Sequence, residues 1–446
     1  MEEVVMASSS SLDSGIGSWE LRSGSERTRY RSSATPPRSL LSLPRRNLLL
    51  SSSSNNNNNQ ILFWSLDRPQ VEVRSFPAEP IGPLVSDSDG AYVIGGGASG
   101  SIYLWEVASG KLLNKWHAHY RSLSCLTLSN DESLLISGSE DGCVRVWSLM
   151  MMFDDIGKEA ARNLYRYNFS EHTLRVTDVA SGHGLCNSIV VSSSEDRTCK
   201  VWSLSEGRSL RTITFPCIID AIAIDPGEHA FYAGGRDGKI YIAALSAECN
   251  PNSSYGEFII GSLSDQSKAV TCLTFSTDGV TLLSGSEDGL VRVWDTKSQH
   301  VIRLLKHGKG PVNNVIIVRQ PIRSTQVLAN TPVPISRKRM HLAIPPPLEK
   351  YVNSTDGEVG NKAVTMFQSP WDDLWDKKYC SSYVMSNQIR DHQQSGSSGG
   401  AEMELERLRQ ECKRSAKMVQ QWKKLYNDLQ NVCANEFLGE VQLGES

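Results

Sequence analysis

Four aspartates recur in similar surroundings and are the first candidates for chemistry: Asp141, Asp196, Asp237 and Asp288. Two carboxylates held close together can act as general acid and base. These four, however, occupy equivalent positions in copies of a repeated segment, so we expect them to lie far apart. Aspartate is also a common turn residue, because its side chain hydrogen-bonds nearby backbone amides. We therefore expect these residues to form turns rather than a catalytic site.

Other signatures of catalysis or cofactor binding are weak. The Gly-rich stretch 95–101 lacks the Gly-Lys-Ser/Thr ending of a phosphate loop. No histidine pair has the H-E-x-x-H spacing of a zinc site, no serine lies in a G-x-S-x-G turn, and the ten cysteines contain no C-x-x-C pair. The sequence therefore predicts no catalytic residue, no metal and no cofactor, and we expect the chain not to be an enzyme.

Charge and composition exclude several classes of protein. The 446 residues include 46 Lys and Arg against 49 Asp and Glu, a formal net charge of -3, so overall charge does not attract nucleic acid or acidic membranes. No apolar run reaches the roughly 18 residues that a membrane helix needs. The acidic start, residues 1–5, lacks the basic and apolar regions of a signal peptide. We therefore expect neither membrane insertion nor secretion, and we expect the cysteines to stay reduced.

A repeated segment supplies the framework for these residues. The sequence SGSEDGCVRVW at 137–147 recurs as SSSEDRTCKVW at 192–202 and SGSEDGLVRVW at 284–294, and four looser copies exist. The seven copies are 41 to 55 residues apart, near the period of roughly 40–45 residues of four-stranded propeller blades. They align on one position, which is tryptophan in six copies and alanine in the other: Trp19, Trp64, Trp105, Trp147, Trp202, Ala243 and Trp294.

Each copy has the pattern of a small antiparallel sheet. An Asp-Gly type of turn precedes a strand with alternating character, in which we expect Val144 and Val146 to point inward and Arg145 outward. Arg292, the counterpart of Arg145 in another copy, is also expected on a solvated strand face. One such sheet cannot bury both faces, so neighbouring sheets must stack around a ring.

The two ends of the repeat region predict how the ring closes. The first copy begins abruptly at residues 3–7 with the strand that normally comes second, so its innermost strand is missing. Residues 311–319 are strand-like, and no Asp-Gly-Trp unit follows them. We expect this late segment to fill the gap in the first sheet and to close the ring without a covalent link.

These repeats resemble WD40 blades over about residues 1–320. Only Trp294-Asp295 is a literal Trp-Asp pair, Ala243 replaces one tryptophan, and Gly-His pairs are largely replaced by residues such as His119 and His172. The resemblance implies an all-β, seven-bladed WD40 propeller closed by a C-terminal strand. We expect this propeller at 1–320, an extended Pro/Ser/Gly-rich linker at 321–400, and a coiled-coil helix at 401–438.

Three segments outside the regular blades suit contacts with other molecules. Residues 150–167 form an insertion with apolar residues at 150–153 and helical periodicity over 156–167, which is either a tolerated loop or a partner contact. The segment IPPPLEKY at 344–351 suits recognition by a groove, or it packs along its own propeller. The basic run 337–339 serves nuclear import or is a solvated loop.

The last segment carries a heptad pattern. Apolar residues alternate in steps of three and four, whereas charged residues such as Lys413, Lys417 and Lys423 fall outside this seam. An isolated helix of this kind is marginal in water, so we expect it to pair with itself in a homodimer, with another chain, or with its own propeller. The seam comprises Leu405, Leu408, Cys412, Ser415, Val419, Trp422, Tyr426, Leu429 and Cys433. The candidate partner-binding residues are Leu405, Leu408, Cys412, Val419, Trp422, Tyr426 and Leu429.

Three segments indicate which group of WD40 proteins the chain resembles. SGSIYLWEVASGKLLNKWHAHYRS at 99–122, SSSEDRTCKVWSL at 192–204, and KGPVNN at 309–314 with IPPPLEKY resemble the WD-repeat subunits of a nucleolar pre-ribosome complex. The resemblance implies a non-enzymatic scaffold in the nucleus, in nucleolus and nucleoplasm. It would join PELP-like and TEX-like subunits, dock on the large-subunit pre-ribosome, act with an AAA ATPase and help to remove internal transcribed spacer RNA. It also implies a role in replication licensing, and leaves direct RNA contact open.

A different class of function stays open beside this one. Residues 294–297, Trp-Asp-Thr-Lys, are similar to the WDxR box that adaptors of cullin ubiquitin ligases recognise. Lys297 stands where that box has arginine, and lysine lacks the planar fork of a guanidinium group. The alternative prediction is therefore a substrate receptor of a cullin-type ligase.

Overall fold

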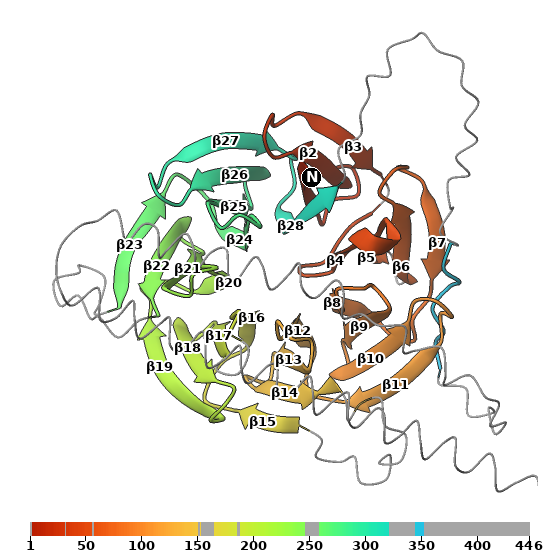
Figure 1. Ribbon diagram of the computed structural model, residues 1–446, viewed down its shortest axis with the longest axis horizontal. Coiled ribbons are helices and arrows are strands. Elements are labelled where there is room, and N and C mark those ends of the chain that lie inside the picture. Colours follow the sequence, from red (N-terminus) through yellow and green to blue (C-terminus); the bar gives the residue numbers. More distant parts are fainter. Residues whose placement is uncertain are drawn as a thin grey trace, which may run out of the picture. The chain divides into compact units, whose positions relative to one another are not determined.

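The computed structural model describes residues 2–31, 33–55, 58–149, 152, 165–184, 188–245, 258–320 and 344–351. In these ranges the chain forms strands β1 to β28 and one short 3-10 helix, η1 (Pro44–Arg46). The strands make seven four-stranded antiparallel sheets, which are arranged as blades around a ring (Figure 1). The predicted all-β, seven-bladed propeller is confirmed.

The blades are numbered along the chain, and their strands are given from the centre outward. Blade 1 contains β28 (Val312–Gln320), β1 (Glu2–Ser9), β2 (Ile16–Glu20) and β3 (Glu26–Tyr30), and blade 2 contains β4 (Leu40–Leu43), β5 (Leu48–Asn55), β6 (Asn58–Ser65) and β7 (Val71–Ser75). Blade 3 contains β8 (Ile81–Ser86), β9 (Tyr92–Gly97), β10 (Ser101–Glu106) and β11 (Leu112–His117), and blade 4 contains β12 (Leu123–Leu128), β13 (Leu134–Ser139), β14 (Val144–Ser148) and β15 (Tyr165–Phe169). Blade 5 contains β16 (Val176–Ser181), β17 (Ile189–Ser194), β18 (Thr198–Ser203) and β19 (Arg208–Thr214). Blade 6 contains β20 (Ile219–Ile224), β21 (Ala230–Gly235), β22 (Lys239–Ala244) and β23 (Ile259–Ser264), and blade 7 contains β24 (Val270–Phe275), β25 (Thr281–Ser286), β26 (Leu290–Asp295) and β27 (Val301–Lys306).

Blade 4 shows how the repeated sequence produces a blade. Val144 and Val146 on β14 are fully buried, whereas Arg145 between them is half-buried, as the alternation predicts. The small residues of β13 permit close stacking of blades: a Cβ at Gly138 would lie 2.5 Å from Cys125 Sγ and 2.8 Å from Val176 of blade 5. Burial of both sheet faces in the stack therefore requires small residues where neighbouring blades approach.

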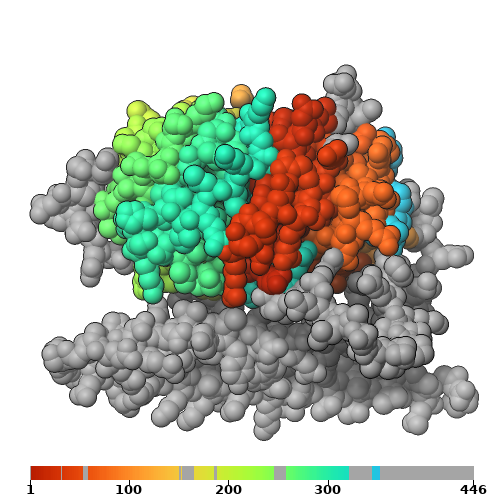
Figure 2. All heavy atoms as spheres, turned by 90° about the horizontal axis from the view of Figure 1, so that it is seen from above, coloured from red at the N-terminus to blue at the C-terminus, as the bar shows by residue number. Residues whose placement is uncertain are grey.

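The predicted closure of the ring is also confirmed. β28 pairs antiparallel with β1, with Glu2 opposite Gln320 and Met6 opposite Ile316. Asn314 Nδ2 donates to Ser8 Oγ at 2.9 Å. Figure 2 shows N-terminal residues of the propeller, in red, directly beside late residues of the propeller, in blue-green. The last described strand thus supplies the innermost strand of the first blade.

The insertion after Trp147 differs from prediction where it is described. Residues 165–167, expected to be helical, lie in β15, the outermost strand of blade 4. The reason is tertiary: β14 needs a partner on its outer edge, and the ring of Phe169 stacks at 4.4 Å on Trp202 of blade 5. Met152 is buried, and its carbonyl accepts a hydrogen bond from Asn114 Nδ2 at 2.8 Å. Residues 153–164 lie outside the described ranges.

Candidate protein-interaction surfaces

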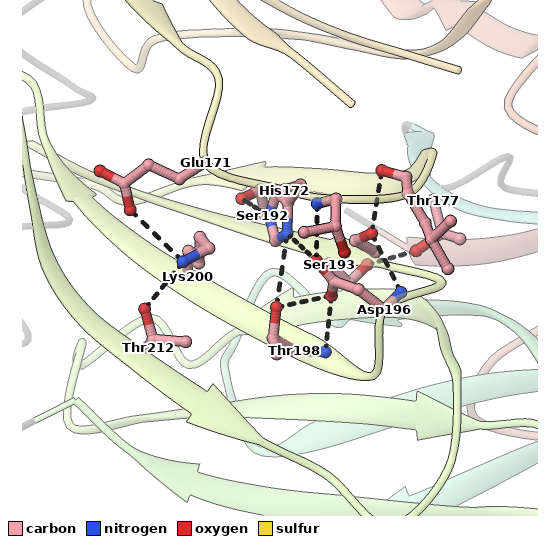
Figure 3. Close-up of polar contacts among 12 residues, drawn as sticks. Glu171, His172, Thr177, Ser192, Ser193, Asp196, Thr198, Lys200 and Thr212 are labelled. Atoms are coloured by element: carbon pink, nitrogen blue, oxygen red, sulfur yellow. Dashed lines mark hydrogen bonds and ion pairs between the residues drawn. The ribbon is translucent and has the colours of Figure 1, made fainter. Parts of the chain in front are cut away.

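Two of the repeated aspartates belong to buried hydrogen-bond networks within single blades. In blade 5 the Nε1–H of Trp202 donates to Ser192 Oγ at 2.8 Å, and this hydroxyl lies 2.8 Å from Nε2 of His172. Nδ1 of the same histidine lies 3.0 Å from the carboxylate of Asp196 (Figure 3). We call this arrangement a tetrad, since it links four residues from the loop before β16 to the third strand of the blade.

Blade 4 repeats the tetrad with Trp147, Ser137, His119 and Asp141. The corresponding distances are 2.9 Å from indole to hydroxyl, 2.7 Å from hydroxyl to imidazole and 3.1 Å from imidazole to carboxylate. Each aspartate also accepts hydrogen bonds from turn amides, such as that of Cys143 at 2.9 Å. The aspartates therefore hold their own turns, and they do so in separate blades.

The environment of the tetrads shifts the pKa values of their titratable groups. Burial lowers the pKa of His119 and of His172, although the aspartate beside each ring acts in the opposite direction. Burial alone would raise the pKa of Asp141, but hydrogen bonds from His119 and from backbone amides outweigh it and hold the pKa at about 2. Because each ring is engaged on both nitrogens, the group is suited to holding strands together rather than to proton transfer with a substrate.

Blades 6 and 7 hold their turns in a different way. In blade 7 the Nε2–H of Gln266 takes the place of the histidine and donates to Ser284 at 2.6 Å, and Asp288 pairs with Arg292 at 2.8 Å. The expectation that Arg292 lies on a solvated face is wrong, because only 6% of it is exposed and it pairs with the half-buried turn carboxylate of Asp288. In blade 6 the Tyr241 hydroxyl donates to Asp237 at 2.5 Å.

Sequence reasoning missed the histidine and serine members of the tetrads. The signal was present, because the serine lies ten positions before the tryptophan in blades 4, 5 and 7. The structure places the seven aligned residues on the third strand of each blade, where none is more than 3% exposed: Trp19, Trp64, Trp105, Trp147, Trp202, Ala243 and Trp294.

Blade 3 lacks the tetrad and contacts the segment IPPPLEKY instead. Gly95 stands where the tetrad has serine, and the indole of Trp105 stacks on Tyr103 at 5.3 Å. The Trp105 Nε1–H donates to the carbonyl oxygen of Glu349 at 2.9 Å. Of the two predictions for this segment, the structure therefore shows packing on its own propeller. We call residues 344–351 the strap.

An arginine connects three blades at the centre of the ring. Arg38, in the loop before β4 of blade 2, pairs through Nε with Asp178 of blade 5 at 2.7 Å. Its Nη2 donates to the carbonyl oxygen of Asp220 in blade 6 at 2.7 Å. The second oxygen of the Asp178 carboxylate accepts the Ile222 amide at 2.8 Å. This bridge ties blade 2 to the opposite side of the ring.

One charged face on blades 4 to 6 is formed by turns between second and third strands, by the loops that lead into first strands and by the start of β20. Arg236 pairs with Glu195 at 2.8 Å and with Asp220 at 2.8 Å, and Arg175 pairs with Glu195 at 3.0 Å. The network has uncharged neighbours in Tyr120, 82% exposed, and Leu174, 51% exposed. Exposed aromatic and aliphatic side chains beside fixed charges are typical of protein-binding surfaces.

A cavity of about 520 Å³ lies at the seam between blades 7 and 1. Its lining includes Glu3, Arg22, Ile302 and Arg319, and no histidine, cysteine or serine is among the residues that line it. Within the described part of the chain no group of three or more His, Cys, Asp or Glu residues could hold a metal ion.

The candidate partner-binding residues of the C-terminal helix, Leu405, Leu408, Cys412, Val419, Trp422, Tyr426 and Leu429, lie outside the described ranges, as does the basic run 337–339. In the ranges that are described, no helix is long and apolar enough to cross a membrane.

Comparison with known proteins identifies the family. The model of the WD domain, G-beta repeat, matches residues 110–148, 164–203 and 257–295, which contain the three copies that keep serine, aspartate and tryptophan. The chain is 47% identical to Protein ROOT INITIATION DEFECTIVE 3 of Arabidopsis thaliana over 97% of this chain and 98% of that protein. It is 34% identical to WD repeat-containing protein 18 of Homo sapiens over 73% and 74%, and 28% identical to Pre-rRNA-processing protein IPI3 of Yarrowia lipolytica over 80% and 83%. The chain belongs to the family of WD-repeat proteins that includes ROOT INITIATION DEFECTIVE 3 and WD repeat-containing protein 18.

Proposed function

We propose that this chain is a non-enzymatic scaffold subunit of a nuclear and nucleolar complex for biogenesis of the large ribosomal subunit. The observation that carries the proposal is similarity along nearly the whole chain to ROOT INITIATION DEFECTIVE 3, together with similarity to relatives that are named for pre-rRNA processing. The step we assign to the complex is removal of internal transcribed spacer RNA from the precursor.

The structure supports a scaffold because its polar groups serve packing. The tetrad histidines are buried and hydrogen-bonded within their blades, and Arg38 is engaged at the centre of the ring. What remains for partners is the outer surface, including the charged face on blades 4 to 6. A rigid ring with several separate surfaces can hold several proteins at once, which raises their effective concentrations toward one another.

The partners that we propose are PELP-like and TEX-like subunits, the AAA ATPase of pre-ribosome remodelling and the large-subunit pre-ribosome. We assign the subunit contacts to the C-terminal helix, through Leu408, Val419 and Trp422 among others, with a homodimer as the alternative arrangement of that helix. A second role in replication licensing belongs to the same proposal, and direct RNA contact is left to the experiment.

The test is affinity purification of the tagged full-length chain from nuclear extract, beside a chain that ends at Ser395. Proteins are identified by mass spectrometry and precursor rRNA is probed in both samples. We expect the full chain to recover the two kinds of subunit and spacer-containing rRNA, and the truncated chain to lose them. A full chain that recovers neither would contradict the proposal, and recovery of a cullin adaptor instead would favour the ligase alternative.

Substitutions in the C-terminal helix test the seam residues more specifically than truncation does. Replacing Leu408, Val419 and Trp422 together by aspartate should abolish recovery of the subunits, because each change puts a charge into an apolar seam. A matched variant carries aspartate at Lys413, Lys417 and Lys423, which fall outside the seam, and should keep recovery. Equal recovery by the two variants would refute the role assigned to the seam.

A further inference from the structure

One position of the outermost strand distinguishes blade 2 from every other blade. The position lies four residues after the one that pairs with the aligned tryptophan or alanine. In six blades a large apolar or aromatic side chain occupies it, and in blade 2 it is a serine. The residues are Tyr30, Ser75, Trp116, Phe169, Ile213, Leu263 and Leu305.

The strap supplies the missing side chain. Leu348 is only 5% exposed and belongs to the apolar cluster that includes Val73 of blade 2 and Leu112 of blade 3. Its backbone N–H donates to the hydroxyl of Ser75 at 2.8 Å. The strap lies beside β7 on the outer surface of blades 2 and 3 (Figures 1 and 2, blue). The small residue on β7 therefore leaves room in this apolar cluster for a leucine from a distant segment.

Blade 3 makes hydrogen bonds with the backbone of the strap. The indole N–H of Trp105 donates to the carbonyl oxygen of Glu349 at 2.9 Å, and the Glu349 N–H donates to the carbonyl oxygen of Gly110 at 2.8 Å. Gly110 has φ +72°, and a Cβ at this position would lie 2.5 Å from the carbonyl oxygen of Pro347. Blade 3 thus offers the strap a hydrogen-bond donor on Trp105 and an acceptor on Gly110, and the lack of a side chain at Gly110 lets the backbone of Pro347 come close.

We propose that the groove between blades 2 and 3 is a binding site for a Pro-Pro-Leu-Glu peptide, and that residues 346–349 of this chain are its ligand. One apolar pocket gives selectivity for leucine, the backbone hydrogen bonds fix the register, and the prolines limit the entropy lost on binding. The connection through residues 321–343 keeps the ligand near the groove at a high effective concentration. The strap therefore anchors residues 344–351 to the outer side of blades 2 and 3.

A peptide supplied in trans tests the site. The protein is the full-length Leu348→Asp variant, whose own strap is released because a charge does not fit the pocket, and the probe is a fluorescent peptide with the sequence of residues 344–351. We expect the peptide to bind this variant at least about tenfold more tightly than it binds the wild-type chain, whose groove is occupied in cis. A peptide with aspartate in place of leucine should bind neither chain.

The matched control is Ile344→Asp in the same strap, because Ile344 is 60% exposed and the groove should stay occupied. No binding to a folded Leu348→Asp chain, or equal binding to this chain and to wild type, would overturn the proposal.

A second variant changes a residue of β7 that contacts the strap. Ser75→Leu gives blade 2 the type of side chain that the other blades have, so it should fill the pocket and displace the strap. Release should speed endoproteinase Lys-C cleavage after Lys350 by about tenfold, because cleavage follows the population of the open form. An unchanged cleavage rate in both Ser75→Leu and Leu348→Asp would refute the assignment of the strap to this groove.

Discussion

The tetrad of blade 5 permits a quantitative prediction for Asp196→Ala. The carboxylate of Asp196 accepts from His172 Nδ1 at 3.0 Å, from the Thr198 amide at 2.9 Å and hydroxyl at 2.6 Å, and from the Thr173 amide at 3.2 Å. His172 is 6% exposed, so its lost partner leaves a buried donor that costs about 1–3 kcal/mol. Water can replace much of the contact with the more exposed threonines, which adds about 1 kcal/mol.

We therefore expect Asp196→Ala to lower the free energy of unfolding by about 3 kcal/mol. Asp278→Ala is the matched control, because Asp278 is exposed and accepts only the Val280 amide at 2.9 Å among the hydrogen bonds of its side chain that the structure records. It should cost about 0.5–1 kcal/mol. Urea unfolding followed by tryptophan fluorescence measures both. If Asp196→Ala costs no more than Asp278→Ala, the tetrad is not a stabilising network and the reasoning fails.

Four further predictions follow from the described contacts. Deleting residues 311–319 should cause aggregation on size-exclusion chromatography rather than mild local loss, because it exposes sheet edges on both sides of the gap; a monomeric, folded product would contradict the closure. Arg38→Met should lower the free energy of unfolding by about 2–3 kcal/mol, since it leaves the Asp178 carboxylate without its charged partner, and the Arg38→Met/Asp178→Leu double variant should recover part of the loss; additive losses would argue against the bridge. Trp105→Phe keeps most of the apolar volume but removes the donor to the strap, so it should speed cleavage after Lys350 by a few fold; no change would count against that hydrogen bond. Burial lowers the pKa of His172 in the folded state, so thermal stability should be full above the ordinary value of 6.5 and fall as the pH drops below it; a melting temperature that rises between pH 6.5 and 5 would contradict the sign.

The seven-bladed ring was predictable because each blade contains a copy of the same sequence pattern. Copies of the segment around Trp147 predict the number of blades, and the first copy's need for an innermost strand points to residues 311–319, which pair with β1 in the structure. Both inferences depend on counting strands within a repeat, which needs no knowledge of side-chain contacts.

Features that break the repeat were harder to predict. The exceptional nature of Ser75 appears only when strand register is known, because spacing between strands varies from blade to blade. Leu348 contacts Ser75 from 273 residues away, and Arg38 reaches Asp178 across the ring. The helical periodicity over 156–167 predicts a helix at Tyr165, whereas pairing with the edge of β14 determines its strand conformation.

Rapid depletion of the chain in cells that make it tests the proposed role in rRNA processing most directly. Precursor rRNA is measured by hybridisation with a probe for the internal transcribed spacer, before growth slows, with the wild-type chain reintroduced as the control. The account predicts that spacer-containing precursor of the large-subunit rRNA accumulates and that the wild-type chain reverses this. Unchanged precursor levels after complete depletion would contradict the account.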